Sequence, residues 1–142
     1  MQKARWIPIA ATAALMSSCN LACAATLDVD VTHLRPTRTV TVMVFCDAGS
    51  WNDRSPIAMR QFRARDTSQT LRIDGLPPGR CAVHVEQATN DSAVELPSFS
   101  VERHGYSGNA SRDRRPPFEH AAVPVGAADA HIPIHLFASE HR

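Results

Sequence analysis

From residue 25 onward, hydrophobic and polar residues alternate along a succession of short segments. In the first of these, Leu27, Val29 and Val31 are separated by single polar residues. Such alternation is typical of a β-strand that packs one face on a core and turns the other to solvent. The alternating segments are 27–32, 40–46, 61–65, 71–74, 81–86, 121–125 and 132–136. With no long helical pattern between them, they predict an all-β fold, a seven-stranded antiparallel β-sandwich of Ig-like architecture.

Turn residues separate these strands and refine the picture. Pro77-Pro78-Gly79 is strong turn chemistry between two of them. Pro133 removes a ladder donor from the last strand, which places that strand at a sheet edge. Ser55-Pro56 resembles an N-cap followed by proline, and it predicts one helical turn in the connection from 47 to 59. Residues 88–117 show no clean periodicity and are predicted to form one long loop.

Residues 1–24 have the composition of a secretory signal peptide. A positive start and an apolar run of eleven residues precede Ala22-Cys23-Ala24, the small residues that a signal peptidase requires. Cleavage there would leave a single exported domain, residues 25–142, in the periplasm or outside the cell. One alternative is a retained anchor, but a bilayer crossing takes about 20 apolar residues. The other is a lipoprotein, with a degraded lipobox before Cys19.

Cleavage also sets the charge of the mature chain. It removes Lys3 and Arg5, so 13 basic residues remain against 14 acidic ones and the net charge becomes −1. Such a chain lacks the basic footprint that binding to nucleic acid requires. No transmembrane segment remains either, so the expected partner is a protein or a small ligand of unknown identity.

Cys46 and Cys81 are the only cysteines of the mature chain. Each continues the apolar parity of its predicted strand, so both side chains are expected to face the core. Two cysteines in an exported protein are a natural disulfide pair, which would close a loop of about 35 residues. The alternative is two buried free thiols, because cysteine is often simply a small core residue.

Three motifs resemble those of one bacterial family. Residues 71–83 resemble its strand, Leu-Pro-Pro-Gly turn and strand. Residues 105–110 resemble its Gly-Phe-Ser-Asn-Asn-Ala element, and residues 116–121 resemble its Pro-Pro-Ser-Phe-Glu-Asp-Ala element. By their order and spacing, the chain is similar to the domain of unknown function 2141 family. The resemblance implies an exported β-sandwich of the prealbumin-like type and no reaction. Residues 86–93 depart from the family's acidic, glycine-containing loop, so a calcium role is not expected here.

Motifs for catalysis or metal binding are weak in this chain. Gly105-Tyr106-Ser107-Gly108 begins like a nucleophile elbow, but Asn109 stands where the elbow requires its second glycine. We therefore expect no enzyme activity and no cofactor. His104 and His120 flank this stretch and, with Glu119, could hold a transition metal. Their spacing is not that of common metal sites, which favours solvated histidines.

A cluster of arginines is the best candidate for recognition. Arg112, Arg114 and Arg115 could clamp a carboxylate or phosphate, or they form a solvated charge run. The residues expected to bind a ligand are Tyr106, Asn109, Arg114, Arg115 and Glu119.

The leading hypothesis for function is a non-enzymatic binding or accessory module that uses the long loop. One alternative is a structural envelope or surface protein acting through an exposed strand edge. The other is a metal-handling periplasmic protein using His104 and His120.

Overall fold

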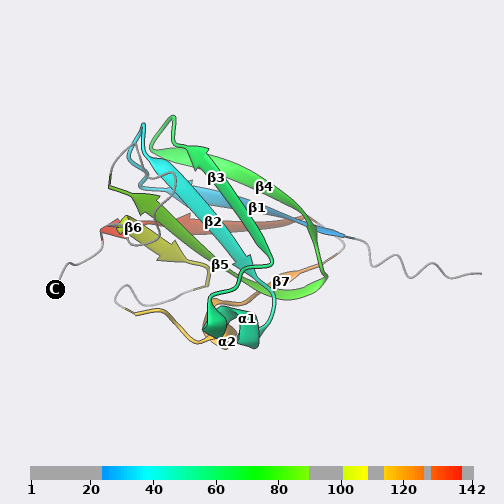
Figure 1. The fold of residues 1–142 in the computed structure, drawn as a ribbon. Coiled ribbons are helices and arrows are strands. Elements are labelled where there is room, and N and C mark those ends of the chain that lie inside the picture. Colours follow the sequence, from blue (N-terminus) through cyan, green and yellow to red (C-terminus); the bar gives the residue numbers. More distant parts are fainter. Residues whose placement is uncertain (1–23, 90–100, 109–113, 127–128, 139–142) are drawn as a thin grey trace, which may run out of the picture.

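The computed structural model describes residues 24–89, 101–108, 114–126 and 129–138, and it contains two β-sheets packed face to face (Figure 1). The smaller sheet has the strand order β4-β1-β8, and the larger has the order β3-β2-β5-β6-β9, with β7 paired to β5. The strands are β1 (Ala25–Thr32), β2 (Thr39–Phe45), β3 (Ala58–Arg63), β4 (Ser68–Leu76), β5 (Gly79–Ala88), β6 (Val101–Tyr106), β7 (Val123–Val125), β8 (Ala130–His135) and β9 (Phe137–Ala138). Two short helices, α1 (Ala48–Asp53) and α2 (Phe118–Ala121), lie side by side against the larger sheet (Figure 1).

The predicted all-β sandwich is confirmed, but the strand number and one pairing were wrong. The described residues form nine strands rather than seven, the additional ones being β6 and the two-residue β9. β1 and β8 run parallel, with Leu27 opposite Ala130 and Val31 opposite Ile134, so the sandwich is not purely antiparallel. A parallel pair requires a crossover connection. Here the chain makes that crossover by passing through the larger sheet between β1 and β8.

Strand β6 lies inside the segment 88–117, which the sequence predicted as one loop. Its Tyr106 pairs directly with His84 of β5. The alternation is hidden because Gly105 stands at an inward position. A Cβ there would lie 2.6 Å from the carbonyl oxygen of His135, so only a residue without a side chain fits where β6 approaches the end of β8.

The core between the sheets follows the predicted alternation. Leu27, Val29 and Val31 of β1 are fully buried, while the residues between them are half-buried. The valines of β2 and β5 oppose them, and the disulfide between Cys46 and Cys81 joins these two strands at the same core. The predicted disulfide is therefore confirmed.

The helical turn predicted between 47 and 59 is present, but it begins earlier than expected. Asp47 is the N-cap of α1, and its carboxylate accepts a 2.7 Å hydrogen bond from the backbone N–H of Ser50. The helix ends where Arg54 takes a left-handed φ of 57°. Ser55-Pro56 therefore follows the helix and does not start it.

Pro133 lies in β8, which is an edge strand as predicted, because β8 pairs only with β1 among the described strands. The predicted signal peptide, apart from Ala24, lies outside the described residues. No helix in the described part of the chain is long and apolar enough to cross a membrane.

Replacing Cys46 and Cys81 together by alanine is expected to lower the free energy of unfolding by about 3–4 kcal/mol. The reason is that the bridge closes a loop in the unfolded chain and so reduces its conformational entropy. Denaturant unfolding of the oxidised wild type and of the double variant would measure this. The reduced wild type is the matched control and should unfold with the double variant. Equal stability of the oxidised and reduced wild type would contradict the prediction.

Candidate functional site

The outer face of the larger sheet carries a second apolar cluster, separate from the core between the sheets. The helices α1 and α2 cover this face beside β2 and β5 (Figure 1). The fully or nearly fully buried members are Phe45, Trp51, Ala82 and Ala121, and Met43, Tyr106 and Phe118 pack against them. This part of the sheet is therefore covered by protein, whereas the outer face of a sandwich sheet is commonly solvated.

Trp51 of α1 lies at the centre of the second cluster. Its side chain is 1% exposed, and its ring meets that of Phe45 edge-on at a centroid distance of 5.2 Å. Its indole Nε1 donates a 2.9 Å hydrogen bond to the carbonyl oxygen of Pro116. This bond satisfies the polar group of a buried tryptophan and ties α1 to the segment before α2.

Arg115 lies against the Trp51 ring. Its guanidinium carbon is 3.7 Å from the centroid of that ring, and its Nη2 donates a 2.8 Å hydrogen bond to the backbone oxygen of Trp51. Its Nη1 lies 3.3 Å from Nδ1 of His84. Burial lowers the pKa of Arg115, but an arginine stays charged throughout the physiological range. The cation is therefore held inside the packing by a ring face and backbone acceptor.

His84 of β5 is kept neutral beside this cation. The residue is 7% exposed, and its ring stacks on the Tyr106 ring, with centroids 4.5 Å apart. Burial, followed by the charges of Arg115, His104 and Arg54, lowers the pKa of His84 to about 3. Because arginine only donates, Nδ1 of His84 accepts from Arg115 and the ring proton resides on Nε2.

Glu86 and His104 form the more exposed side of the same group. Nε2 of His84 lies 3.6 Å from Oε1 of Glu86, but His84 is neutral, so this contact is not an ion pair. Burial raises the pKa of Glu86, while the charges of His104 and Arg115 oppose that shift. His104 stands directly across the β5–β6 pair from Glu86. We call His84, Glu86, His104, Tyr106 and Arg115 the histidine–arginine cluster.

The Gly105-Tyr106-Ser107-Gly108 segment joins the parts of this arrangement. Ser107 is fully buried, and its Oγ accepts a 2.7 Å hydrogen bond from the N–H of Val83 and donates a 2.6 Å bond to the carbonyl oxygen of Ala121. Gly108 has a φ of 75°, and a Cβ there would lie 2.2 Å from the carbonyl oxygen of His120. The serine and glycine that suggested a nucleophile elbow therefore attach α2 to β5.

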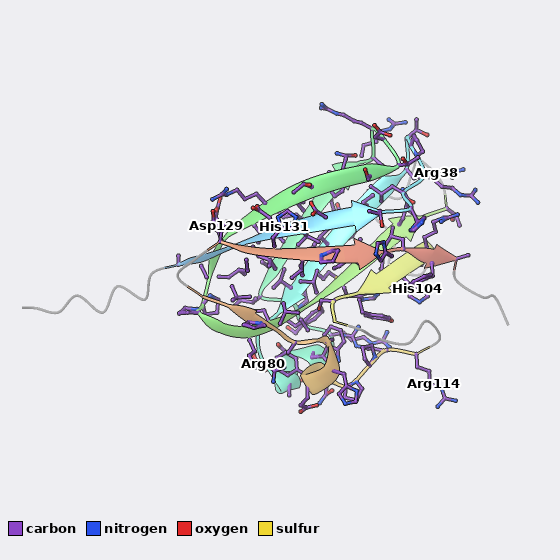
Figure 2. All side chains as sticks on the ribbon, turned by 180° about the vertical axis from the view of Figure 1, so that it is seen from behind. Arg38, Arg80, His104, Arg114, Asp129 and His131 are labelled. Atoms are coloured by element: carbon purple, nitrogen blue, oxygen red, sulfur yellow. A yellow bond between two sulfur atoms is a disulfide. The ribbon has the colours of Figure 1, made fainter. Side chains whose placement is uncertain are left out.

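The structure brings together two of the five residues predicted to bind a ligand. Tyr106 and Arg115 belong to the histidine–arginine cluster, where both are half-buried. Arg114 points away from the body into solvent (Figure 2), and Glu119 is exposed on α2. Asn109 lies outside the described residues. Of the predicted set, the described residues leave Arg114 and Glu119 accessible to a ligand.

The predicted metal ligands are not gathered into a site. His104 extends from β6 (Figure 2), whereas His120 is exposed on α2. In the described part of the chain, no group of three or more His, Cys, Asp or Glu residues is arranged to hold a metal ion. The placement of His104, His120 and Glu119 therefore gives the metal hypothesis no site.

Trp51 and His84 organise the cluster, although neither was predicted from the sequence as a site residue. His84 alternates with buried valines and looked like a solvent-facing residue. The signal lay on the neighbouring strand, where Met43 and Phe45 occupy outward positions. Two large apolar side chains on an outward face indicate that another element covers that face.

Edge strand β3 offers a second, more accessible surface. Ile57, just before the strand, and Met59 are 56% and 53% exposed, and they are the only large hydrophobic side chains that the described residues leave exposed. At the other end of β3 is an open hollow of about 600 Å³. Thr37, Phe62, Arg63, Ala64, Arg65 and Gln69 line it.

Fold and surface together define an all-β, disulfide-bonded domain with one helix-covered sheet face and one apolar strand edge. The chain belongs to the family described as "Uncharacterized protein conserved in bacteria" (DUF2141), which it matches over residues 29–133. The resemblance drawn from its three motifs is thus confirmed. Comparisons with curated proteins and with solved structures found no significant match.

Replacing Arg115 by alanine is expected to lower the free energy of unfolding by about 2 kcal/mol, because a cation–π contact and charged hydrogen bonds are lost. Arg114→Ala is the matched control and should change stability by less than about 0.5 kcal/mol. Arg115→Lys keeps the charge but not the planar guanidinium, and its free energy of unfolding should lie between those of the two alanine variants. Chemical denaturation measures all three. Equal stability of the two alanine variants would show that Arg115 does not hold the cluster.

The neutral His84 should make the protein less stable in mild acid. Between about pH 6.5 and pH 3, His84 is protonated in the unfolded chain but neutral in the native protein. The free energy of unfolding therefore falls as the pH falls. One such group contributes up to about 1.4 kcal/mol per pH unit.

The raised pKa of Glu86 acts in the opposite direction, since the native state then holds a proton that the unfolded state has released. The comparison is therefore between wild type and His84→Gln, which retains every other group. Urea unfolding between pH 7 and pH 5 should show a steeper loss in the wild type. Parallel pH profiles would mean that His84 has the same pKa in the native and the unfolded protein.

Proposed function

We propose that this protein is an exported, non-enzymatic binding or accessory module whose partner is another protein. The exposed apolar pair Ile57 and Met59 on the edge of a sheet carries this proposal. Exposed apolar side chains along an unpaired strand edge are costly in a free protein, and they suit contact with a second polypeptide.

The histidine–arginine cluster supports a role without catalysis. Groups with displaced pKa values often mark active sites. In this cluster, however, Arg115 is stacked on Trp51 and occupies Nδ1 of His84. The hydroxyl of buried Ser107 is already hydrogen-bonded to two backbone groups. These side chains stabilise the fold and are poorly placed to reach a substrate.

Export is part of the proposal. The disulfide between Cys46 and Cys81 favours an oxidising compartment, and residues 1–24 have the composition of a signal peptide. We also propose that the fold is of the prealbumin-like class, which the family resemblance implies.

The strand edge also bears on the choice between the hypotheses drawn from the sequence. A small-ligand site on the loop around Arg114 and Arg115 would need both arginines accessible, but Arg115 is engaged in packing. A partner bound along β3 needs no such rearrangement. The structural surface-protein hypothesis, which also uses a strand edge, therefore shares its binding surface with the module proposed here.

Site-specific photo-crosslinking in the native bacterium tests the proposal. A photoreactive residue at Met59 should give a discrete adduct with one partner, identified by mass spectrometry, and the same residue at exposed Arg114 should not. The crosslinked chain should begin at Ala25 if the signal peptide is cleaved as predicted. Adducts from Arg114 alone would place the binding surface on the loop around Arg114. Adducts from neither position would contradict a binding role.

A further inference from the structure

The edge of β3 presents an incomplete ladder. Among the described strands, β3 pairs with β2 alone, along the register from Thr39–Arg63 to Val44–Ala58. In an antiparallel pair, alternate residues of an edge strand direct their N–H and C=O groups away from the partner. The carbonyl oxygen of Met59 accepts a 3.0 Å hydrogen bond from the exposed Arg60 guanidinium. Once Arg60 turns to a carboxylate, the outer side of β3 can accept one more strand by backbone hydrogen bonding.

The side chains along this edge divide between its two faces. Met59 stands opposite Met43 and so belongs to the outer face, next to the exposed Ile57. Phe62 stands opposite buried Val40 and faces the interior, where it is only partly buried and lines the hollow of about 600 Å³. An added strand would thus find apolar contacts on both faces.

The hollow extends this surface toward the smaller sheet. It lies between Phe62 of β3 and Gln69 of β4. Strands β3 and β4 are consecutive in the chain and lie on the same side of the sandwich (Figure 1). It is open to solvent, and Ala64 contributes to its floor. One side chain of an added strand could enter there, and the arginines of the lining favour a carboxylate.

Charge distinguishes which strand would fit. The segment from Ser55 to Arg65 contains Arg60, Arg63 and Arg65 and no acidic residue, and all three arginines are exposed. Arg60 stands opposite Val42, on the interior-facing side of the edge. A charge at such a position discourages unselective pairing, because an incoming strand must bring an opposite charge to match it.

A second copy of this chain does not meet that condition. In antiparallel pairing of β3 with itself, neither copy supplies a carboxylate from this segment, and like charges on adjoining strands are destabilising. A strand carrying carboxylates meets it, since guanidinium and carboxylate groups pair in a bidentate geometry.

Resting on the proposed function, we propose that β3 binds an extended protein segment in which acidic and apolar residues alternate. Backbone hydrogen bonds add this segment as a further strand beside β3. Alternate residues of a strand point to opposite faces. The apolar side chains of this segment therefore contact Met59 on the outer face. Its carboxylates lie on the interior-facing side, where Arg60 stands and where Arg65 lines the hollow.

The probe is a fluorescein-labelled peptide of about seven residues, the length of a typical strand, alternating glutamate and valine. Fluorescence anisotropy should show saturable binding that weakens as salt is raised, because exposed charges are screened. A lysine–valine peptide should not bind. A glutamate–valine peptide with methylated backbone nitrogens should lose most of the binding, because it cannot complete the ladder.

Charge reversal provides the sharper test. Arg60→Glu combined with Arg65→Glu should weaken binding of the acidic peptide by about tenfold or more and create binding of the lysine–valine peptide. Arg63 is left in place because its Nε donates a 3.0 Å hydrogen bond to the backbone of Thr37. Arg114→Glu is the matched control and should leave both affinities unchanged. A circular dichroism spectrum like that of wild type would show that the double variant is folded.

Each contrary result has a distinct meaning. Equal binding of acidic and basic peptides, or full binding by the methylated peptide, would overturn the proposal. A concentration-dependent dimer in sedimentation that is lost on Met59→Glu would overturn it in favour of a second copy. Crosslinks from Met59 without peptide binding would leave the proposed function standing and reject only the partner's chemistry. Peptide binding without crosslinks in the cell would reject the proposed function and retain the surface.

Discussion

The stacking of Arg115 on the ring of Trp51 is the contact on which the outer half of this molecule depends. Trp51 belongs to the connection between β2 and β3, whereas Arg115 belongs to the connection between β6 and β7. Neither helix is long enough to be stable by itself, since α1 has six residues and α2 four. Their mutual contact, together with the bond from Trp51 to Pro116, covers the outer face of the larger sheet.

Covering that face has an electrostatic consequence. Burial of His84, and after it the permanent charge of Arg115, makes a positive charge on the imidazole unfavourable, so the ring remains neutral and accepts a hydrogen bond. The displaced pKa values that would ordinarily suggest catalysis thus follow from packing. The same reasoning explains Ser107, whose hydroxyl joins two backbone segments inside the fold.

Much of the sandwich could be predicted from the sequence because its core strands alternate cleanly, and the disulfide followed from the parity of Cys46 and Cys81. Strand β6 could not, because Gly105 removes the inward side chain that would have marked the alternation. The second cluster could not either, because it joins residues 64 positions apart through one tryptophan. Alternation reports which face of a strand is apolar, but not that a polar face is covered by a distant segment.

Beyond residue 24 the chain contains arginine but no lysine, and the structure uses arginine in two opposite ways. At Arg115 the planar, weakly hydrated guanidinium tolerates burial against a ring, which an ammonium group would resist. At Arg60 and Arg65 the same group stays in water, where it keeps unrelated strands from pairing with β3. The helices cover part of the outer face of the larger sheet, whereas Ile57 and Met59 at the β3 edge stay exposed. Selectivity at that edge then rests on charge, because the backbone ladder itself accepts any extended segment.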